Sequence, residues 1–237
     1  MEILPNIEII DLALFLKKQK ILVLADLHIG FEESLNKQGI LVPRFQFEDL
    51  VKRLENILKQ VNPKLIIING DLKHEFGQIS ETEWRQTLKI LDFLTKKAGI
   101  ILLKGNHDKI LGPIAEKRKL EIKDYYKVDD MYICHGNIIP EDVDFKKSKT
   151  VIIGHEHPAI GIREYPRVER FKCFLLGKYE NKKLIVQPSL NLVTEGTDIL
   201  SEKLLSPFLH QNLDNFEVFI IQDKVYNFGT LGKLKSL

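Results

Sequence analysis

Carboxylate, amide and imidazole side chains recur in this sequence directly after short apolar runs. All of the 7 histidines except His210 lie at or just beyond the ends of such runs. The polar residues in these positions are Asp26, His28, Asp71, His74, Asn106, His107, His135, His155 and His157. Oxygen and imidazole ligands without thiolates suit divalent ions such as Mn²⁺, Fe²⁺ or Zn²⁺. One such ion needs about four to six ligands, so this set is large enough for two.

The apolar runs have the length and composition of buried strands. They are Ile21–Ala25, Leu65–Ile68, Ile100–Leu103, Met131–Cys134 and Val151–Ile153. Runs of this length, bounded by glycine and polar residues, are typical of strands buried on both faces. Ligand clefts in open α/β sheets form outside the carboxyl ends of the strands. We therefore expect the polar residues that follow these runs to converge on one point.

Helices and a second sheet account for much of the remaining chain. Phe47–Gln60 has the apolar spacing of an amphipathic helix, and Ser80-Glu81-Thr82-Glu83 is a capping box for a helix that runs to about Lys97. Asp129-Asp130 and Glu180-Asn181 are typical of hairpin turns. Further strands are expected at Leu184–Val186, Val218–Ile221 and Val225–Phe228. The sequence predicts an α/β fold in which two mixed sheets flanked by helices form a four-layer α/β/β/α sandwich, with one domain over residues 1–237.

The composition is typical of a globular protein and argues against several other classes. Hydrophobic residues make up 44% and charged residues 29%, and the formal net charge of +2 neither demands nor excludes nucleic acid. The 2 cysteines cannot build a disulfide framework, and Cys134, inside an apolar run, is expected to be a buried free thiol. No apolar run approaches the ~20 residues of a membrane span, and no secretory signal is visible at the N-terminus. We expect a cytoplasmic protein with no membrane partner.

Five of the polar clusters resemble, in order, the sequence blocks of calcineurin-like metallophosphoesterases. The blocks are Asp26-Leu27-His28, Gly70-Asp71, Gly105-Asn106-His107-Asp108, His135-Gly136 and Gly154-His155-Glu156-His157. Each block alone recurs by chance, but five in order, each after an apolar run, make a specific pattern. The resemblance extends from about residue 21 to residue 158.

The resemblance implies a centre of two divalent metal ions. The implied ligands are Asp26, His28 and His157 for one ion, Asn106, His135 and His155 for the other, and Asp71 for both. Mn²⁺ is the expected ion, and Fe²⁺, Zn²⁺ and Ni²⁺ are the alternatives. A carboxylate that bridges two cations about 3.5–4 Å apart offsets their mutual repulsion.

The same resemblance implies roles around the metal centre. His107 would face the scissile phosphate as a general acid, and Asp108 would orient His107 or a metal-binding imidazole. His74, Asn106 and Arg44 are the expected substrate contacts. Arg44 is chosen for its chemistry, because a guanidinium group can clamp a phosphate bidentately, and surface ion pairing is the alternative for it. For His74, simple support of the site is an equal alternative to substrate contact.

Two features are similar to a narrower group. Gly70-Asp71-Leu72-Lys73-His74 resembles the Gly-Asp-Leu-Phe-His block of SbcD-type nucleases, with Lys73 in place of the aromatic residue. The stretch from Phe31 to Gln46 resembles archaeal and bacterial SbcD-related phosphoesterases, a group that includes a phosphoesterase associated with DNA ligase.

The expected function is hydrolysis of phosphodiesters by attack of a metal-bridging hydroxide, with nucleic acid or a nucleotide as substrate. A phosphomonoesterase acting on nucleotides or phosphoprotein would share this site and remains an alternative. A third hypothesis is a non-catalytic protein-binding scaffold of the same fold. The scaffold is disfavoured because His107 and every implied ligand are present. A homodimer is expected only by analogy with dimeric members of the family.

Overall fold

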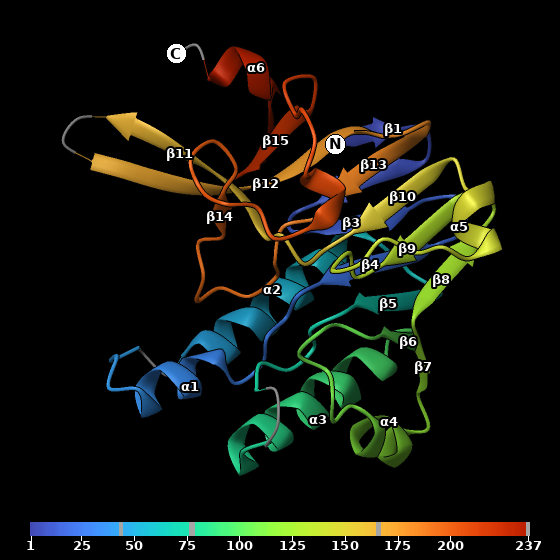
Figure 1. Cartoon of the computed structure of the whole chain (residues 1–237). Coiled ribbons are helices and arrows are strands. Elements are labelled where there is room, and N and C mark those ends of the chain that lie inside the picture. Colours follow the sequence, from blue (N-terminus) through green and yellow to red (C-terminus); the bar gives the residue numbers. More distant parts are fainter. Residues whose placement is uncertain (43–44, 76–78, 165–166, 236–237) are drawn as a thin grey trace.

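Two mixed β-sheets face each other in the computed structural model, which describes residues 1–42, 45–75, 79–164 and 167–235 (Figure 1). The first sheet has the order β1 (Glu2–Leu4), β2 (Ile7–Ile10), β3 (Ala13–Leu16), β4 (Ile21–Ala25), β5 (Leu65–Asn69), β6 (Gly99–Leu103) and β7 (Glu121–Lys123). Strands β1 to β4 pair antiparallel, whereas β4 to β7 pair parallel. The parallel half therefore directs the carboxyl ends of β4, β5 and β6 to one edge.

The second sheet is also mixed. Its strands are β8 (Tyr125–Val128), β9 (Met131–Cys134), β10 (Thr150–Ile153), β11 (Pro158–Glu164), β12 (Arg167–Tyr179), β13 (Lys182–Val186), β14 (Thr197–Asp198), β15 (Glu217–Ile221) and β16 (Val225–Thr230). The order is β14-β11-β12-β13-β10-β9-β8, and β15 pairs with both β12 and β16. Strands β9, β10 and β13 run parallel, so β9 and β10 also end at a common edge.

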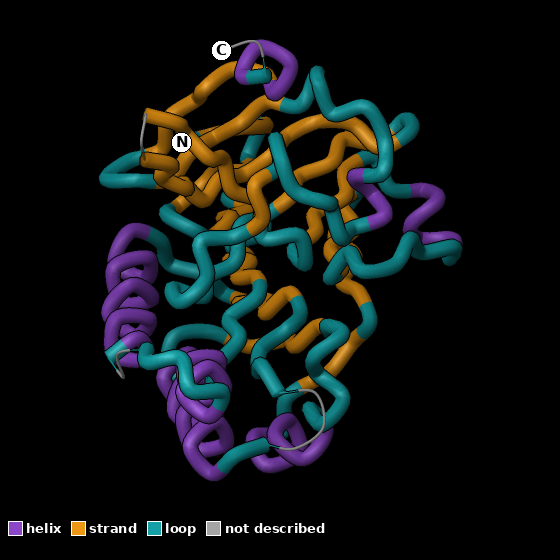
Figure 2. Tube along the Cα trace, turned by 60° about the vertical axis from the view of Figure 1, so that its left-hand side comes forward, coloured by secondary structure: helices purple, strands orange, loops and turns teal. Residues whose placement is uncertain are grey.

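Helices cover the outer faces of both sheets, unequally. Helices α1 (Phe31–Lys37), α2 (Gln46–Gln60), α3 (Glu81–Thr95) and α4 (Gly112–Arg118) lie on the side of the first sheet. The second sheet is covered by shorter pieces, α5 (Val143–Lys147), the 3₁₀ helix η1 (Pro207–Leu209) and α6 (Leu231–Leu234). Figure 2 shows the longer helices gathered on one side of the strands. The predicted α/β class with two mixed sheets flanked by helices is confirmed, and the fourth layer is thin.

The apolar runs are unbroken because successive residues of a strand face two different hydrophobic cores. In β10, Ile152 packs into the core between the sheets, whereas Val151 and Ile153 pack into a second core beneath α5 and η1. Both faces of the strand are thus buried, as the sequence indicated. The predicted strands Ile21–Ala25 and Met131–Cys134 match β4 and β9 residue for residue.

The predicted helices and turns are also present. Helix α3 begins after Ser80, whose side chain accepts a hydrogen bond from the Glu83 N–H at 3.0 Å, and it ends at Thr95, earlier than predicted. Asp129 and Glu180 adopt left-handed φ angles of 51° in the turns between β8 and β9 and between β12 and β13. Cys134 and Cys173 are buried free thiols. Within the described ranges, no helix has the length and apolar character needed to cross a bilayer.

Candidate metal centre

Five loops bring the predicted ligands to one place. They follow β4, β5 and β6 of the first sheet and β9 and β10 of the second, each at the carboxyl end of its strand. Three groups of side chains could hold a metal ion, because the donor atoms within each lie within 4.8 Å of one another. They are Asp26, His28 and His157; Asp71, His135 and His155; and His28, His74 and His107. The first two groups correspond to the two sites expected from the sequence, apart from Asp71, which was expected in both. The third group was not expected, because His74 and His107 were expected to face the substrate.

The Asp71 carboxylate lies between the histidines of the two expected sites. Its Oδ2 is 3.6 Å from His28 Nε2 and 3.4 Å from His135 Nε2. Its Oδ1 accepts a hydrogen bond from the backbone N–H of His107 at 2.9 Å, which fixes the carboxylate. A single oxygen thus faces one imidazole from each group, the position that a bridging ligand requires.

The spacing of donor atoms within each group fits divalent ions. The ring nitrogens of His28 and His157 are 3.2 Å apart, and those of His135 and His155 are 3.1 Å apart. His135 Nε2 also lies 2.9 Å from Asn106 Oδ1. Two ligands about 2.1 Å from one ion, at tetrahedral to octahedral angles, lie about 3.0–3.4 Å from each other. Donor types and spacing therefore both suit metal coordination.

Many of the predicted ligands have a strained backbone conformation. Left-handed φ angles occur at Asp26 (54°), His28 (43°), Asp71 (45°), His155 (65°) and His157 (52°). Such a conformation costs about 1–3 kcal/mol at a residue other than glycine, and it persists only where the surroundings enforce it. The hydrogen bonds around these loops must therefore supply the restraint.

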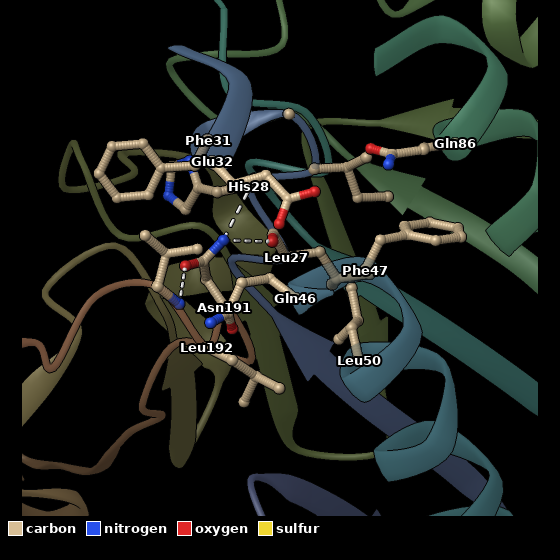
Figure 3. Close-up of a pocket in the computed structure, with 13 residues that line it drawn as sticks. Leu27, His28, Phe31, Glu32, Gln46, Phe47, Leu50, Gln86, Asn191 and Leu192 are labelled. Atoms are coloured by element: carbon tan, nitrogen blue, oxygen red, sulfur yellow. Dashed lines mark hydrogen bonds between the residues drawn. The ribbon is translucent and has the colours of Figure 1, made fainter. Parts of the chain in front are cut away.

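A segment that follows β13 restrains the loop after β4. Asn191 Nδ2 donates to the carbonyl oxygens of Leu27 at 3.0 Å and His28 at 3.2 Å, as Figure 3 shows. Ser189 Oγ donates to the carbonyl of Asp26 at 2.7 Å. The Nζ of the half-buried Lys172 in turn donates to the carbonyl of Ser189 at 2.8 Å and to that of Asn191. The sequence could not assign Ser189 and Asn191 a role, because polar residues that follow a strand can border a cleft but are also explained by a plain turn.

A second segment restrains the loops after β9 and β10. The fully buried Glu156 accepts hydrogen bonds from the backbone N–H groups of Leu205 at 2.8 Å and Ser206 at 2.7 Å. Ser206 Oγ donates to the carbonyl of Gly136 at 2.7 Å. Burial raises the pKa of Glu156, against the effect of these hydrogen bonds. Glu156 therefore ties the loop that carries His155 and His157 to the chain beneath it.

Two glycines permit the close approach of the loops. A Cβ atom at Gly105 would lie 2.0 Å from Asp71 Oδ1, and one at Gly154 would lie 2.5 Å from Asp26 Oδ2. Any side chain at these positions would displace a carboxylate that belongs to the ligand set. Steric exclusion of a side chain thus explains why glycine stands at these two positions of the sequence blocks.

Burial and neighbouring charge set the protonation of the ligands. Burial lowers the pKa of His28 well below its usual value and lowers that of His155 to about 4, so both rings are neutral at pH 7. Burial opposes the charged form of His135 too, but the carboxylates of Asp71 and Asp26 raise its pKa to about 9. Burial likewise opposes the charge on Asp71, and its contacts with His135 and His28 outweigh that effect and lower its pKa. A metal ligand must be deprotonated. Binding of an ion by Asp71, His135 and His155 would therefore release the proton of His135.

His107 lies at the edge of the centre in a defined orientation. Its Nδ1 is 2.5 Å from the carbonyl oxygen of His74, and because a carbonyl only accepts, Nδ1 is the protonated donor. Its Nε2 is 4.0 Å from Asp71 Oδ2. His74 stacks on Phe31, with ring centroids 4.2 Å apart, and its ring lies 5.3 Å from that of His107. Burial lowers the pKa of His74 to about 4, so its ring is neutral.

Asp108 and Arg44 differ in what the structure shows of them. The Asp108 carboxylate accepts from the backbone N–H of Gly105 at 3.0 Å and, at longer distances, from those of Leu72 and Lys73. It joins the loops after β5 and β6, and burial raises its pKa to about 6. Its hydrogen-bond partners among the described residues are backbone groups rather than the imidazole expected from the sequence. Arg44 lies outside the described residues.

Comparisons with known proteins agree with this geometry. Residues 19–196 match the family model of the calcineurin-like phosphoesterases. The Pseudomonas putida nuclease MPE superposes with a TM-score of 0.69 at 18% identity, over 93% of each chain. Yfce, a phosphoesterase from E. coli, is 12% identical, with a TM-score of 0.38 over 84% of this chain and 86% of that one. No curated protein matches the chain by sequence.

The family match covers most of the chain, including all five loops that carry the predicted ligands. The fold of the nuclease MPE extends the agreement to the two sheets and their connections. Family membership implies a phosphoester hydrolase that depends on divalent metal ions, which the clustered histidines and aspartates can hold. The chain belongs to the calcineurin-like phosphoesterase family.

Proposed function

We propose that the protein is a phosphodiesterase that binds two divalent ions and acts on nucleic acid or a nucleotide diester. The observation that carries the proposal is the position of the Asp71 carboxylate, with Oδ2 3.6 Å from His28 and 3.4 Å from His135. The remaining ligands would be Asp26 and His157 on one side, and Asn106, His135 and His155 on the other. Mn²⁺ is the ion we propose.

Bound ions of this kind supply a water molecule that is deprotonated at neutral pH, and they neutralise phosphate charge. The chain itself must then assist the departing oxygen. His107 would do so by releasing a proton from Nε2, because its Nδ1 is already committed to the carbonyl of His74. His74, whose neutral ring stacks on Phe31 and lies beside that of His107, would contact the substrate next to the scissile bond.

A diester substrate is favoured over a monoester by two observations. The nuclease MPE shares the fold over 93% of both chains. The Gly-Asp-Leu-Lys-His block of the SbcD-related resemblance places His74 next to His107, so two imidazoles flank the ligand set. The same sequence block is the reason that we propose an SbcD-related subgroup for the chain.

A substrate panel tests the proposal. The purified protein, loaded with Mn²⁺, is incubated with bis-p-nitrophenyl phosphate, p-nitrophenyl phosphate, and single- and double-stranded DNA. We expect a higher kcat/KM on the bis ester than on the monoester, and cleavage of DNA. A higher kcat/KM on the monoester would favour a phosphomonoesterase. No hydrolysis of any diester by protein with metal shown to be bound would overturn the proposal.

A further inference from the structure

The peptide group between His74 and Glu75 is held from both sides. Its carbonyl oxygen, that of His74, accepts the hydrogen bond from His107 Nδ1 at 2.5 Å. Its N–H, that of Glu75, donates to Glu83 Oε1 at 3.0 Å. The preceding N–H, that of His74, donates to the same oxygen at 2.9 Å. A carboxylate on α3 is thus connected to the His107 ring through one amide.

The Glu83 carboxylate has little freedom to move. The side chain is 1% exposed, and its own N–H is fixed by Ser80 Oγ at the start of α3. A Cβ atom at Gly30 would lie 2.8 Å from Glu83 Cγ, so the side chain packs directly against the backbone that precedes α1. Burial raises the pKa of Glu83, while the N–H groups of Glu75 and His74 favour its charged form. Besides its place in the capping box of α3, Glu83 therefore holds the backbone of His74 and Glu75.

Lys73 restrains the same loop from the other end. Its side chain is fully buried, and Nζ donates to the carbonyl of His107 at 2.7 Å and to the carbonyl of Glu75. Its positive charge also lowers the cost of burying the Glu83 carboxylate. Lys73 occupies the position of the aromatic residue in the similar block, and in this chain its ammonium group fixes the backbone of His107.

We propose that Glu83 is a positioning residue for His107. By holding the peptide group between His74 and Glu75, it aims the carbonyl at Nδ1 and so fixes the tautomer and the ring plane, with Nε2 turned toward the metal centre. An amide whose N–H is bound to a carboxylate is polarised, and its carbonyl is a stronger acceptor. In other catalytic histidines a carboxylate bonded directly to one ring nitrogen sets the tautomer, and here the carboxylate would act through the intervening amide. The consequence for catalysis rests on the proposed function, whereas the consequence for the tautomer does not.

Nitrogen NMR of the histidine rings tests the inference without any activity. Protein with ¹⁵N-labelled histidine, observed by long-range ¹H–¹⁵N correlation, should show the neutral ring of His107 with its hydrogen on Nδ1. Glu83→Ala should shift His107 toward the Nε2–H form, and Glu83→Gln, which can still accept from both N–H groups, should restore the wild-type spectrum. Glu81→Gln is the matched control, because Glu81 lies exposed in the same helical turn. An Nε2–H tautomer in the wild-type protein would overturn the inference even if no variant folds.

Kinetics on two diesters test the catalytic consequence. A general acid matters most for a poor leaving group. We therefore expect Glu83→Ala to lower kcat by roughly tenfold or more for an alkyl diester and by less than about threefold for the bis-p-nitrophenyl ester, with KM and Mn²⁺ affinity unchanged. In a His107→Ala background, Glu83→Ala should cause no further loss. Equal losses on both diesters would assign Glu83 a purely structural role. Absence of all diester hydrolysis would refute the proposed function and leave the tautomer result standing.

Discussion

Replacement of Asn191 by alanine removes the hydrogen bonds that hold the loop after β4. The Asn191 side chain, 5% exposed, donates to the carbonyls of Leu27 and His28 and accepts from the N–H groups of Val193 and Thr194 at 2.8 and 3.2 Å. Each such bond contributes about 0.5–1.5 kcal/mol, and a buried carbonyl left without a donor costs about 1–3 kcal/mol. We expect the free energy of unfolding to fall by roughly 2–4 kcal/mol in urea denaturation with a chelator present.

The same substitution should weaken metal binding. Asp26 and His28 hold left-handed φ angles of 54° and 43°, and the lost restraint would let both ligands relax away from the ion. Residues that orient metal ligands typically contribute about 10–100-fold to affinity. The dissociation constant for Mn²⁺ at the site of Asp26 and His28 should therefore be about 10–100-fold higher in the variant than in the wild type. Asn62→Ala, at an exposed position, is the control and should change neither quantity. Unchanged stability together with unchanged Mn²⁺ affinity in Asn191→Ala would refute this reasoning.

Three further substitutions give distinct outcomes. His107→Ala should retain Mn²⁺ binding but lower kcat for diester hydrolysis by about 10²–10⁴-fold, and unaffected hydrolysis would show that the measured activity is incidental. Asp71→Asn should weaken binding of both ions in calorimetric titrations, and loss of only one would argue against a bridging position. Burial lowers the pKa of Lys172 to about 7, whereas its value in the unfolded chain is about 10.4, so the unfolded state binds more protons between these values and stability should rise with pH there. Lys172→Met should lack that rise in pH-dependent urea denaturation, and identical pH profiles would contradict the assignment.

Strand positions and the ligand set could be predicted because each signal is local. A buried parallel strand is a short apolar run, and the residue that follows it must lie at the carboxyl edge of the sheet. Asp26, Asp71 and His135 each follow such a run directly or within three positions, so their convergence required only that the strands be adjacent.

The elements that were not predicted lack such signals. Helix α1 begins after Gly30, at a φ of 93° and without a side-chain cap, so no capping residue marks its start. Turns among β1 to β4 use left-handed Asn6, Asp11 and Lys20 in place of glycine. The β11–β12 hairpin carries charged residues along strands that lie partly exposed, which hides the alternation expected of a strand.

The residues that restrain the site could not be assigned this role from the sequence for a different reason. Asn191 and Leu27 are 164 positions apart, and their contact joins a side chain to a backbone carbonyl. A carbonyl is present at every residue, so no choice of residue type at position 27 reports the contact. Glu83 was recognised from the sequence only as part of a capping box, because its second role depends on where the loop after β5 folds.

Stepwise addition of Mn²⁺ to the metal-free protein, with hydrolysis of bis-p-nitrophenyl phosphate as the readout, tests the central claim most directly. The position of Asp71 between the two ligand groups predicts that diester hydrolysis appears mainly with the second equivalent of Mn²⁺ and reaches a plateau at two per chain. Full activity at one equivalent, or none when two ions are bound, would contradict a dinuclear phosphodiesterase.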